Sequence, residues 1–302
     1  MITVLTPTYN RGYVIKQAYD SLIKQTDNNF EWLVIDDGST DKTKKIVDNF
    51  IKEKKIKIRY IYKENGGKHT ALNVGINKAK GQLILILDSD DYLSDNAIEL
   101  VNKYWKKYKD NKKICGMTFL RKLSNPFYKE KLFKECTSNM IDFKYNNNNL
   151  ADMCEVMRTD ILKEYPYPVF PNEKFLSEVI VTGEIAEKYD TAYIPIEIYY
   201  TEYLEDGLSK NWFRLVVNNP LGARANNKMF MSKKYKFSIR LKNCIMFDVF
   251  SFIAHKKIVK ETKMKFFAIL FYIPSFFVAK YLEKKYKKVT NYKKSIPFYQ
   301  KS

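Results

Sequence analysis

The sequence predicts an α/β fold, a doubly wound and mostly parallel sheet, followed by a helical basic segment. Short apolar runs of strand length alternate with amphipathic stretches of helix length through the first 120 residues. Successive loops after strands are rich in Asp, Asn, Gly and Thr. Because the carboxyl ends of parallel strands share one edge of a sheet, we expect these loops to converge there, where open α/β sheets bind ligands.

The first elements are marked by their apolar patterns. Ile2–Thr6 is a strand-like run that ends in a loop containing Pro, Asn and Gly. Apolar residues at helical spacing predict a helix over Tyr13–Lys24. The second strand is expected at Trp32–Ile35, and a helix over Ser39–Lys54 follows its polar end. A third strand, Ile56–Tyr62, continues the alternation.

The next strand–helix unit contains a glycine loop. Residues 64–69 form this loop, which opens a helix over Thr70–Ala79, and Gly81 breaks that helix. The fourth strand, Leu83–Leu87, has five aliphatic residues in a row, which is typical of a strand buried on both faces. Its carboxyl end is therefore expected at the ligand-binding edge of the sheet.

Three carboxylates follow the fourth strand within four residues, namely Asp88, Asp90 and Asp91. Aspartate is depleted from strands, so strand formation does not account for them. They are typical ligands of a hard divalent cation that also binds phosphates. The alternative is a cap for the helix expected over Asn96–Tyr108, which Ser94 or Asp95 opens. One carboxylate suffices for a cap, and it would follow Tyr92, so the cluster favours metal binding.

The missing phosphate-binding motifs narrow the class of ligand. Neither G-x-G-x-x-G after the first strand nor G-x-x-x-x-G-K-[ST] is present. Acidic loops in a doubly wound domain fit a diphosphate bridged by a metal better than they fit hydride transfer.

The positive charge is concentrated at the C-terminal end. The chain has 302 residues, 45% of them apolar, and a formal net charge of +19, which suits one large domain or one domain with an appendage. Residues 228–302 contain 19 basic and 3 acidic residues, a net charge of +16, which leaves +3 for residues 1–227. Such asymmetry indicates an anionic partner, either a membrane or a nucleic acid. No nucleic-acid-binding module is recognisable, so we expect no nucleic acid.

One stretch suits the membrane interface. Lys265–Lys280 encloses 14 residues that are almost all apolar and include a proline, which is too short to cross a bilayer. A helix lying in the interface with its lysines at anionic headgroups is expected, the alternative being an ordinary helix that covers the domain.

The cysteines and the N-terminal residues indicate the cellular compartment of the protein. The four cysteines, Cys115, Cys136, Cys154 and Cys244, lack metal-ligand spacing and are expected to be buried apolar residues in a reducing compartment. No signal peptide and no run of about 18 uncharged apolar residues is recognisable. We therefore expect a cytoplasmic protein, peripheral at the inner face of the cell membrane.

Four motifs in order resemble the family 2 glycosyltransferases of the GT-A fold. They are Thr6–Arg11 (TPTYNR), Ile35–Asp41 (IDDGSTD), Asn65–Gly67 with Ala71–Gly75 (NGG and ALNVG), and Leu87–Asp91 (LDSDD). The resemblance is strong to about residue 120, looser to about residue 212 and slight beyond. It implies a GT-A, Rossmann-like domain over residues 1–212, with a nucleotide-sugar half (1–120) and an acceptor half (121–212). Residues 213–302 would be the basic, aromatic-rich helical segment.

The resemblance implies an inverting transfer of a hexosyl or N-acetylhexosaminyl group. The donor would be a nucleoside diphosphate sugar, and uridine diphosphate is expected because it is common among the donors of this family. The acceptor would be a glycan or a lipid-linked glycan in cell-surface polysaccharide synthesis, and Mn²⁺ or Mg²⁺ would assist. The oligomeric state is not predicted.

The same resemblance assigns the donor site. The donor-binding residues would be Pro7, Tyr9, Arg11, Asp37, Lys68, His69, Asp88 and Ser89. Pro7 and Tyr9 would flank the base, and Asp37 would accept a hydrogen bond from uracil. Asp90 would bind the metal, with Asp88 and Asp91 as alternative ligands.

One position departs from the family's pattern. The family often has Arg before the Asn of the third motif, where this chain has Leu72. Lys68 or Arg11 would supply that positive charge instead, although Lys68 is also interpretable as a solvated loop lysine. His69 would contact the donor phosphate or sugar, or would simply open the helix.

Inverting transfer needs a carboxylate that accepts the proton of the attacking hydroxyl. In the family this base lies in a Glu-Asp pair at the start of a helix, and this chain has Glu178-Val179. We expect Glu178 to be the base, with Glu184 as runner-up. The alternative is that Glu178 only stabilises the helix N-terminus.

The segment after the strand Tyr193–Tyr200 suits a loop over the donor and the acceptor. Lys210 would meet the diphosphate and Trp212 would stack on a sugar, or Trp212 would pack into a hinge before a helix over Phe213–Ala225. Two other functions compete. One is a phosphoryl-transfer enzyme of the haloacid dehalogenase type that uses Asp88 and Asp90, and the other is an inactive membrane adaptor.

Overall fold

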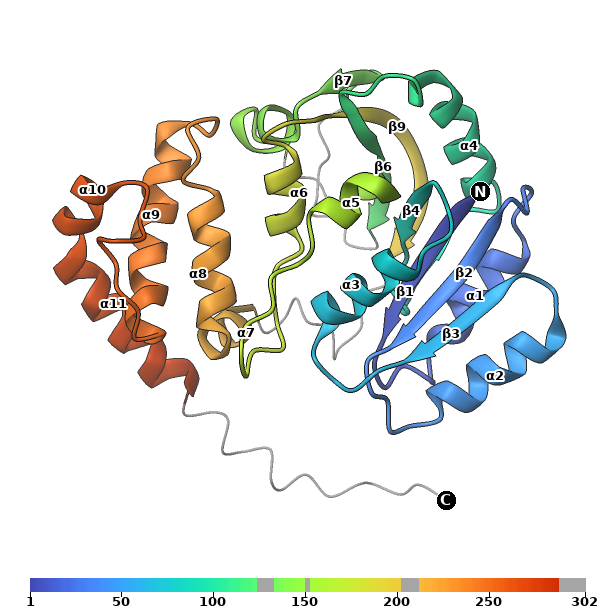
Figure 1. Cartoon of the computed structure of the whole chain (residues 1–302), viewed down its shortest axis with the longest axis horizontal. Helices are drawn as coiled ribbons and strands as arrows, with labels where there is room; N and C mark the ends of the chain where they lie inside the picture. The colour runs from blue at the N-terminus through green and yellow to red at the C-terminus, as the bar shows by residue number, and fades with distance from the viewer. Residues whose placement is uncertain (124–132, 150–152, 202–211, 288–302) are drawn as a thin grey trace. The chain divides into compact units, whose positions relative to one another are not determined.

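The computed structural model describes residues 1–123, 133–149, 153–201 and 212–287 (Figure 1). The chain forms two compact units. Met1–Val169 and Glu178–Leu204 make the first, and Phe170–Ser177 and Glu205–Ser302 make the second.

The first unit is built on a sheet whose N-terminal half is parallel. This half consists of β1 (Ile2–Thr8), β2 (Phe30–Asp36), β3 (Ile58–Tyr62) and β4 (Leu83–Ile86), in the order β3-β2-β1-β4. β1 and β2 are buried along their whole length, and β4 is buried except for the half-buried Ile86, so the aliphatic runs form the centre of the sheet. The predicted α/β fold with its parallel sheet is confirmed.

Helices cover both faces of this half of the sheet. They are α1 (Ile15–Ile23), α2 (Thr43–Glu53), α3 (Lys68–Lys78) and α4 (Ala97–Tyr108). The apolar stripes of α1, α2 and α4 share one core cluster with Trp32 of β2, and Tyr19 stacks on Phe50 with 4.0 Å between the ring centroids.

α3 packs closely on the sheet because Gly75 has no side chain. A Cβ placed on Gly75 would lie 2.2 Å from Cδ1 of the buried Leu5 in β1. The glycine of the third motif therefore has a packing task, because it lets the helix approach the strand.

The second half of the sheet is mixed. It contains β5 (Asp91–Leu93), β6 (Ile114–Leu123), β7 (Cys136–Ser138), β8 (Met153–Arg158) and β9 (Asp190–Thr201). The order continues from β4 through β8, β6 and β9 to β5, and β7 pairs with β9. β6 runs parallel to β9, whereas β8 is antiparallel to both of its neighbours. The π-helix η1 (Ile141–Asn146) and the helices α5 (Thr159–Glu164) and α6 (Val179–Ile185) complete this half.

The second unit is helical. Its described helices are α7 (Trp212–Asn218), α8 (Pro220–Met229), α9 (Phe237–Ile253), α10 (Lys265–Leu270) and α11 (Tyr272–Tyr286). α9 lies between α8 and α11 and shares apolar clusters with both (Figure 1). In the part of the chain that the structure describes, no helix has both the length and the apolar content that a bilayer crossing requires.

Two expected helices are each broken in two. The helix expected over Phe213–Ala225 stops at Asn218 and restarts at Pro220, because proline lacks an N–H and disfavours helical backbone in the residue before it. The stretch Lys265–Lys280 breaks at Phe271 rather than at its proline, which lies in the first turn of α11 and is tolerated there. All four cysteines are free; Cys136 is half-buried and the other three are buried, as expected.

Candidate active site

The carboxylate cluster lies at the carboxyl end of β4 and is fixed by a tyrosine of β9. The Tyr199 hydroxyl accepts a hydrogen bond from the backbone N–H of Asp88 at 3.0 Å and donates one to Oδ2 of Asp91 at 2.7 Å. Gln17 of α1 donates a hydrogen bond to the backbone carbonyl of Asp90. The loop is thus held by hydrogen bonds from two elements, β9 and α1.

Burial and mutual repulsion make this cluster electrostatically unfavourable without a cation. Burial, and then the charge of Asp88, raise the pKa of Asp90 and raise that of Asp91 to about 7. Burial would also raise the pKa of Asp88, but the cations of Lys68, Arg121 and Arg11 outweigh it and lower that pKa. Asp88 therefore keeps its negative charge, and its neighbours are carboxylates that a further cation would stabilise.

Lys68 joins the donor motif to the expected base. Its Nζ lies 2.6 Å from Oδ1 of Asp88 and 2.6 Å from Oε1 of Glu178. Burial opposes its charge, but the two carboxylates outweigh burial and raise the pKa of Lys68 above its usual range. Lys68 is therefore a charged bridge between two sites that lie 90 residues apart in the sequence, and not a solvated loop lysine.

The departure at Leu72 has a structural reason. Leu72 is fully buried in α3, so a charged side chain there would lie in the core. Lys68 lies one turn earlier in the same helix and supplies the ammonium from its first turn. The positive charge expected from the third motif is thus present, displaced by one helical turn.

Asp37 holds the glycine loop. Its Oδ1 accepts hydrogen bonds from Nζ of Lys63 at 2.5 Å and from the N–H of Gly66 at 3.0 Å, and its Oδ2 accepts from Nδ2 of Asn65 at 3.1 Å and from the N–H of Gly67 at 2.7 Å. Gly67 has a φ of 96°, which favours glycine. These four donors occupy the acceptor positions of the carboxylate. The uracil contact expected for Asp37 stays a prediction.

Two buried polar atoms beside Asp37 indicate a place for a ligand. Among the described residues, neither Oγ1 of Thr8 nor Nδ1 of His69 has a hydrogen-bond partner, although both atoms are buried. Thr8 is the last residue of β1, and its carbonyl accepts the backbone N–H of Asp37. Burial lowers the pKa of His69, which therefore stays neutral at pH 7. Such unpaired atoms are costly unless a ligand or water satisfies them.

Residues of the first motif, Thr6–Arg11, form the rim of the site next to the carboxylate cluster. Pro7 pairs with Ile35 at the end of the parallel ladder, and Tyr9 is 48% exposed just beyond it. Arg11 donates from Nη1 to the Tyr13 hydroxyl. Its charge helps to lower the pKa of Asp88 and partly opposes the rise in the pKa of Asp90. Ser89 is buried within the carboxylate loop. These expected donor residues therefore gather at one edge of the sheet, together with Asp37 and Lys68.

The remaining expected residues have different positions. Glu178 is the N-cap residue of α6 and Val179 is its first residue, whereas Glu184 is exposed one and a half turns further along the helix. Trp212 begins α7 in the second unit and packs edge-on against Phe175 at 5.5 Å between ring centroids. Lys210 lies outside the described residues.

Two residues of the site, Arg121 and Tyr199, were not predicted from the sequence. Arg121 of β6 stacks over the Tyr199 ring, with its guanidinium carbon 4.0 Å from the ring centroid. Its charge helps to lower the pKa of Asp88 and partly opposes the rise in the pKa of Asp91. An arginine in a buried apolar strand is unusual enough to serve as a signal. Tyr199 offers none, because tyrosines are frequent in that strand.

Asn73 of the third motif clamps a distant segment. Its Nδ2 donates to the carbonyl of Tyr167 at 2.9 Å, and its Oδ1 accepts the N–H of Tyr167 at 2.8 Å. The charge of Glu178 is close enough to raise the pKa of Tyr167, after burial as the larger cause. Asn73 thus aligns the extended stretch that leads toward the expected base.

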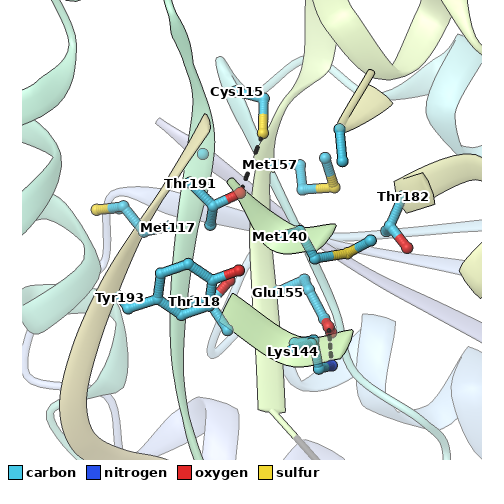
Figure 2. A pocket seen from close by; sticks show the side chains of 12 residues that line it. Cys115, Met117, Thr118, Met140, Lys144, Glu155, Met157, Thr182, Thr191 and Tyr193 are labelled. Carbon is cyan, nitrogen blue, oxygen red and sulfur yellow. Dashed lines mark hydrogen bonds and ion pairs between the residues drawn. The ribbon is translucent and has the colours of Figure 1, made fainter. Parts of the chain in front are cut away.

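A separate concavity opens elsewhere in the first unit (Figure 2). It is lined by β6, β8, β9, α6 and the η1 region, with Thr182 on α6 and Ala186 at the C-terminal end of that helix. Lys144 faces Glu155 across it, with 3.4 Å between Nζ and Oε1 (Figure 2). It includes none of the expected site residues, so the candidate active site is the carboxylate cluster and its rim.

A divalent metal suits this site. Asp88 and Asp90 offer hard oxygen donors, and the raised pKa of Asp90 reflects charge that a cation would relieve. Asp91 is less available, because Tyr199 occupies one of its oxygens. Within the described ranges, no group of three His, Cys, Asp or Glu side chains is placed to hold a metal ion.

Comparisons with known proteins identify the family of the chain. A model of the family described as "Glycosyl transferase family 2" matches residues 3–165. Glycosyltransferase GlyG of Streptococcus pneumoniae serotype 4 is 41% identical over 100 residues, which cover 33% of this chain and 33% of that protein. Glycosyltransferase GlyA of the same organism is 37% identical over 107 residues, 35% of this chain and 15% of that protein. The chain thus spans a third or less of these two relatives.

Solved structures share the fold over nearly the whole chain. S. aureus TarS 1–349 in complex with UDP-GlcNAc has a TM-score of 0.62 at 18% identity and covers 95% of this chain and 92% of that one. Mannosyltransferase PcManGT from Pyrobaculum calidifontis, in complex with GDP-Man and Mn²⁺, has a TM-score of 0.57 at 16% identity, over 97% and 88%. At these identities the likeness concerns the fold alone. Since the family model matches more than half of the residues, the chain belongs to glycosyl transferase family 2.

Proposed function

We propose that the protein transfers a hexosyl or N-acetylhexosaminyl group from a nucleoside diphosphate sugar to a hydroxyl of a glycan or lipid-linked glycan, with inversion. The observation that carries this proposal is the shared ammonium of Lys68, which touches both Asp88 of the donor motif and Glu178. The shared contact places the expected base next to the expected donor site, and such proximity is what a direct displacement needs.

Glu178 acts as the base in this scheme. Its carboxylate takes the proton of the acceptor hydroxyl as that oxygen attacks the anomeric carbon from the face opposite the leaving group. The bond from the anomeric carbon to the diphosphate oxygen breaks, and the nucleoside diphosphate leaves. Glu178 is half-buried at the N-terminus of α6 and remains open to an acceptor.

Lys68 has two tasks in sequence. Without donor, it neutralises Asp88 and Glu178 together. A bound diphosphate adds a third anionic partner, and the ammonium then stabilises the charge that develops on the leaving oxygen. As Lys68 turns toward the diphosphate, the carboxylate of Glu178 is left free to accept the proton of the acceptor hydroxyl.

A divalent cation would complete the donor site. Asp90 and Asp88 would hold it, and donor phosphates would supply other ligands, as is usual for Mg²⁺ and Mn²⁺. When bound, the cation would withdraw charge from the leaving diphosphate. Lys68 and Arg11 contribute positive charge to the same carboxylates from the protein side.

Uridine diphosphate is the proposed carrier. The solved neighbour TarS binds UDP-GlcNAc, whereas PcManGT binds GDP-Man, so the fold accommodates both bases. The neutral, buried His69 and the orphaned Thr8 hydroxyl beside Asp37 offer polar atoms for a base edge. We place the reaction in cell-surface polysaccharide synthesis at the cytoplasmic face of the membrane.

Thermal unfolding against a panel of nucleoside diphosphates, with Mn²⁺ or with chelator, tests the donor site. A ligand at 100 times its dissociation constant stabilises the folded state by about 2.7 kcal/mol. We expect a metal-dependent rise in Tm with uridine diphosphate that is lost in Asp90→Asn and retained in Asp110→Asn, an exposed carboxylate outside the site. No shift with any nucleotide in the presence of metal would contradict the proposal.

The two competing functions are distinguished in different ways. Phosphoryl transfer of the haloacid dehalogenase type is set aside, because the chain belongs to another family. An inactive adaptor would bind nucleotide and transfer no sugar to any acceptor. Such inactivity would have a specific reason, because Val179 stands where the family has the Asp of its Glu-Asp pair.

A further inference from the structure

The helices α10 and α11 present bulky apolar side chains to solvent. Phe266, Ile269, Leu270, Ile273, Phe277 and Tyr281 each expose between 58% and 71% of their surface, and we call these six residues the apolar face. Phe276 and Val278 beside them are also exposed. Scattered exposed apolar residues are ordinary in soluble proteins, but a contiguous set on two consecutive helices marks an interaction surface.

The inward side of these helices shows the opposite composition. Ala268 of α10 and Ser275 and Ala279 of α11 are fully buried or nearly so, and Leu282 is the one large residue among the buried positions of α11. An amphipathic helix of a soluble protein turns its large apolar residues inward. Here the buried positions are mostly small, and the rings of Tyr272 and Phe276 pack on Phe252 of α9. The six residues of the apolar face are exposed instead, so covering the second unit does not account for them.

Lysines surround the apolar face. Between Lys256 and Lys287 the chain has nine lysines and two glutamates. Lys265 begins α10, and Lys280, Lys284 and Lys285 are exposed toward the end of α11. Nζ of Lys285 lies 5.5 Å from the Tyr281 ring centroid, so apolar and cationic groups are side by side. Long lysine stems allow the charge to reach a polar layer while the helix body lies deeper.

We propose that the apolar face inserts into the surface of a bilayer that contains anionic lipid. The six side chains would enter the boundary between headgroups and acyl chains, and the lysines would contact anionic headgroups. A second copy of this chain fits less well, because a self-complementary contact would bring lysines against lysines. The inference does not depend on the proposed sugar transfer.

Vesicle co-sedimentation of the full chain tests this inference. The probes are vesicles of phosphatidylcholine alone and vesicles with about 30% phosphatidylglycerol, a content in the range of anionic membrane leaflets. We expect binding to the anionic vesicles that weakens with salt, and little binding to the neutral ones. Ile273→Gln with Phe277→Gln should weaken binding by about tenfold per residue, because each loses apolar contact with the lipid.

Lysine replacements separate the contribution of charge from that of the apolar face. Lys265→Gln, Lys284→Gln and Lys285→Gln should each lower binding to anionic vesicles by about fivefold. The matched controls are Lys45→Gln, Lys52→Gln and Lys57→Gln for charge and Ile51→Gln for apolar exposure, all on or near α2 of the first unit. These controls keep the vesicle binding of the original chain. The exposed positions leave the core intact, so circular dichroism should not change.

Three results would overturn the inference. Equal binding to neutral and anionic vesicles would remove the role of the lysines. If the variant Ile273→Gln with Phe277→Gln bound anionic vesicles as well as the control Ile51→Gln does, the apolar face would have no role. The third result is a dimer, detected by light scattering, that dissociates in the variant Ile273→Gln with Phe277→Gln, while the original chain does not bind lipid. That result would assign the apolar face to a second copy of the chain.

Discussion

Lys68 is the residue on which the proposed chemistry depends most, because it neutralises two carboxylates at once. Lys68→Met leaves Asp88 and Glu178 without their shared cation, and we expect kcat to fall by about 10²- to 10³-fold, the loss typical of one electrostatic donor. Lys68→Arg should recover part of this loss, because the charge is kept. Lys78→Met, at the exposed end of the same helix, should retain normal activity. Equal activity of Lys68→Met and Lys78→Met would contradict the proposed role.

The choice between the two candidate bases is also decided by single residues. Glu178→Gln removes the proton acceptor but keeps the size of the side chain, and kcat should fall by about 10²- to 10⁴-fold. Nucleotide binding measured by calorimetry should persist, since the donor residues are unchanged. Glu184→Gln should leave kcat within about twofold, because Glu184 is exposed further along α6. The reverse order of the two losses would make Glu184 the base.

Asp248 predicts a pH dependence of stability. It is fully buried in α9, and among the described residues neither of its carboxylate oxygens has a hydrogen-bond partner. Burial raises its pKa from 3.8 to about 7. The folded chain therefore holds a proton between about pH 4 and pH 7 that the unfolded chain releases, so the free energy of unfolding falls as pH rises through this window.

Urea denaturation at several pH values measures this effect. The slope from Asp248 is up to about 1.4 kcal/mol per pH unit, and it flattens above about pH 7. Asp248→Asn should remove it and stabilise the protein at pH 8, whereas the exposed Asp110→Asn should do neither. An unchanged pH profile in Asp248→Asn would show that Asp248 does not titrate in this range.

At the scale of elements, the contact between α3 and β1 is the tightest test of packing. A Cβ on Gly75 would lie 2.2 Å from Cδ1 of Leu5, so Gly75→Ala must displace either the helix or the leucine. We expect a loss of about 1–3 kcal/mol in the free energy of unfolding, measured by urea denaturation. Leu5→Ala provides the space, so the double variant should lose less than the two single variants combined. Strictly additive losses would contradict this packing argument.

Helices and strands are predictable from the sequence where the pattern that specifies them lies within the element itself. Leu83–Leu87 reads as a buried strand because its aliphatic run has no polar interruption, and β4 confirms it. β5 has no such signal, since its three residues become a strand only by pairing with Tyr199–Thr201 of β9. The break at Phe271 was not predictable, because neither glycine nor proline occupies that position.

The same limit applies to the candidate site. The motifs placed the donor residues at one edge of the sheet, because parallel strands share their carboxyl end. The partners of those residues depend on tertiary contacts, as when Arg121 and Tyr199 meet beneath the cluster although they lie on different strands. The four hydrogen bonds to Asp37 likewise become visible only once the glycine loop is folded.

At the scale of the whole molecule, charge is divided between the two ends of the chain. Residues 228–302 carry +16 and the rest only +3, so salt should affect two properties differently. At about 0.5 M NaCl, where exposed charges are strongly screened, binding to anionic vesicles should fall at least tenfold. Transfer to a water-soluble acceptor should change far less, because the Lys68 contacts are partly buried. Parallel loss of both would indicate that membrane contact and catalysis are inseparable.

The bridge formed by Lys68 has an evolutionary consequence. Because Asp88 and Glu178 share one nitrogen, a change at any of the three positions alters the charge at the other two. Single replacements should therefore be selected against, and natural relatives should exchange these positions as a set. A relative that carries an uncharged residue in place of Lys68 is expected to have a compensating change at the position of Asp88 or Glu178, or a cation supplied from a neighbouring loop.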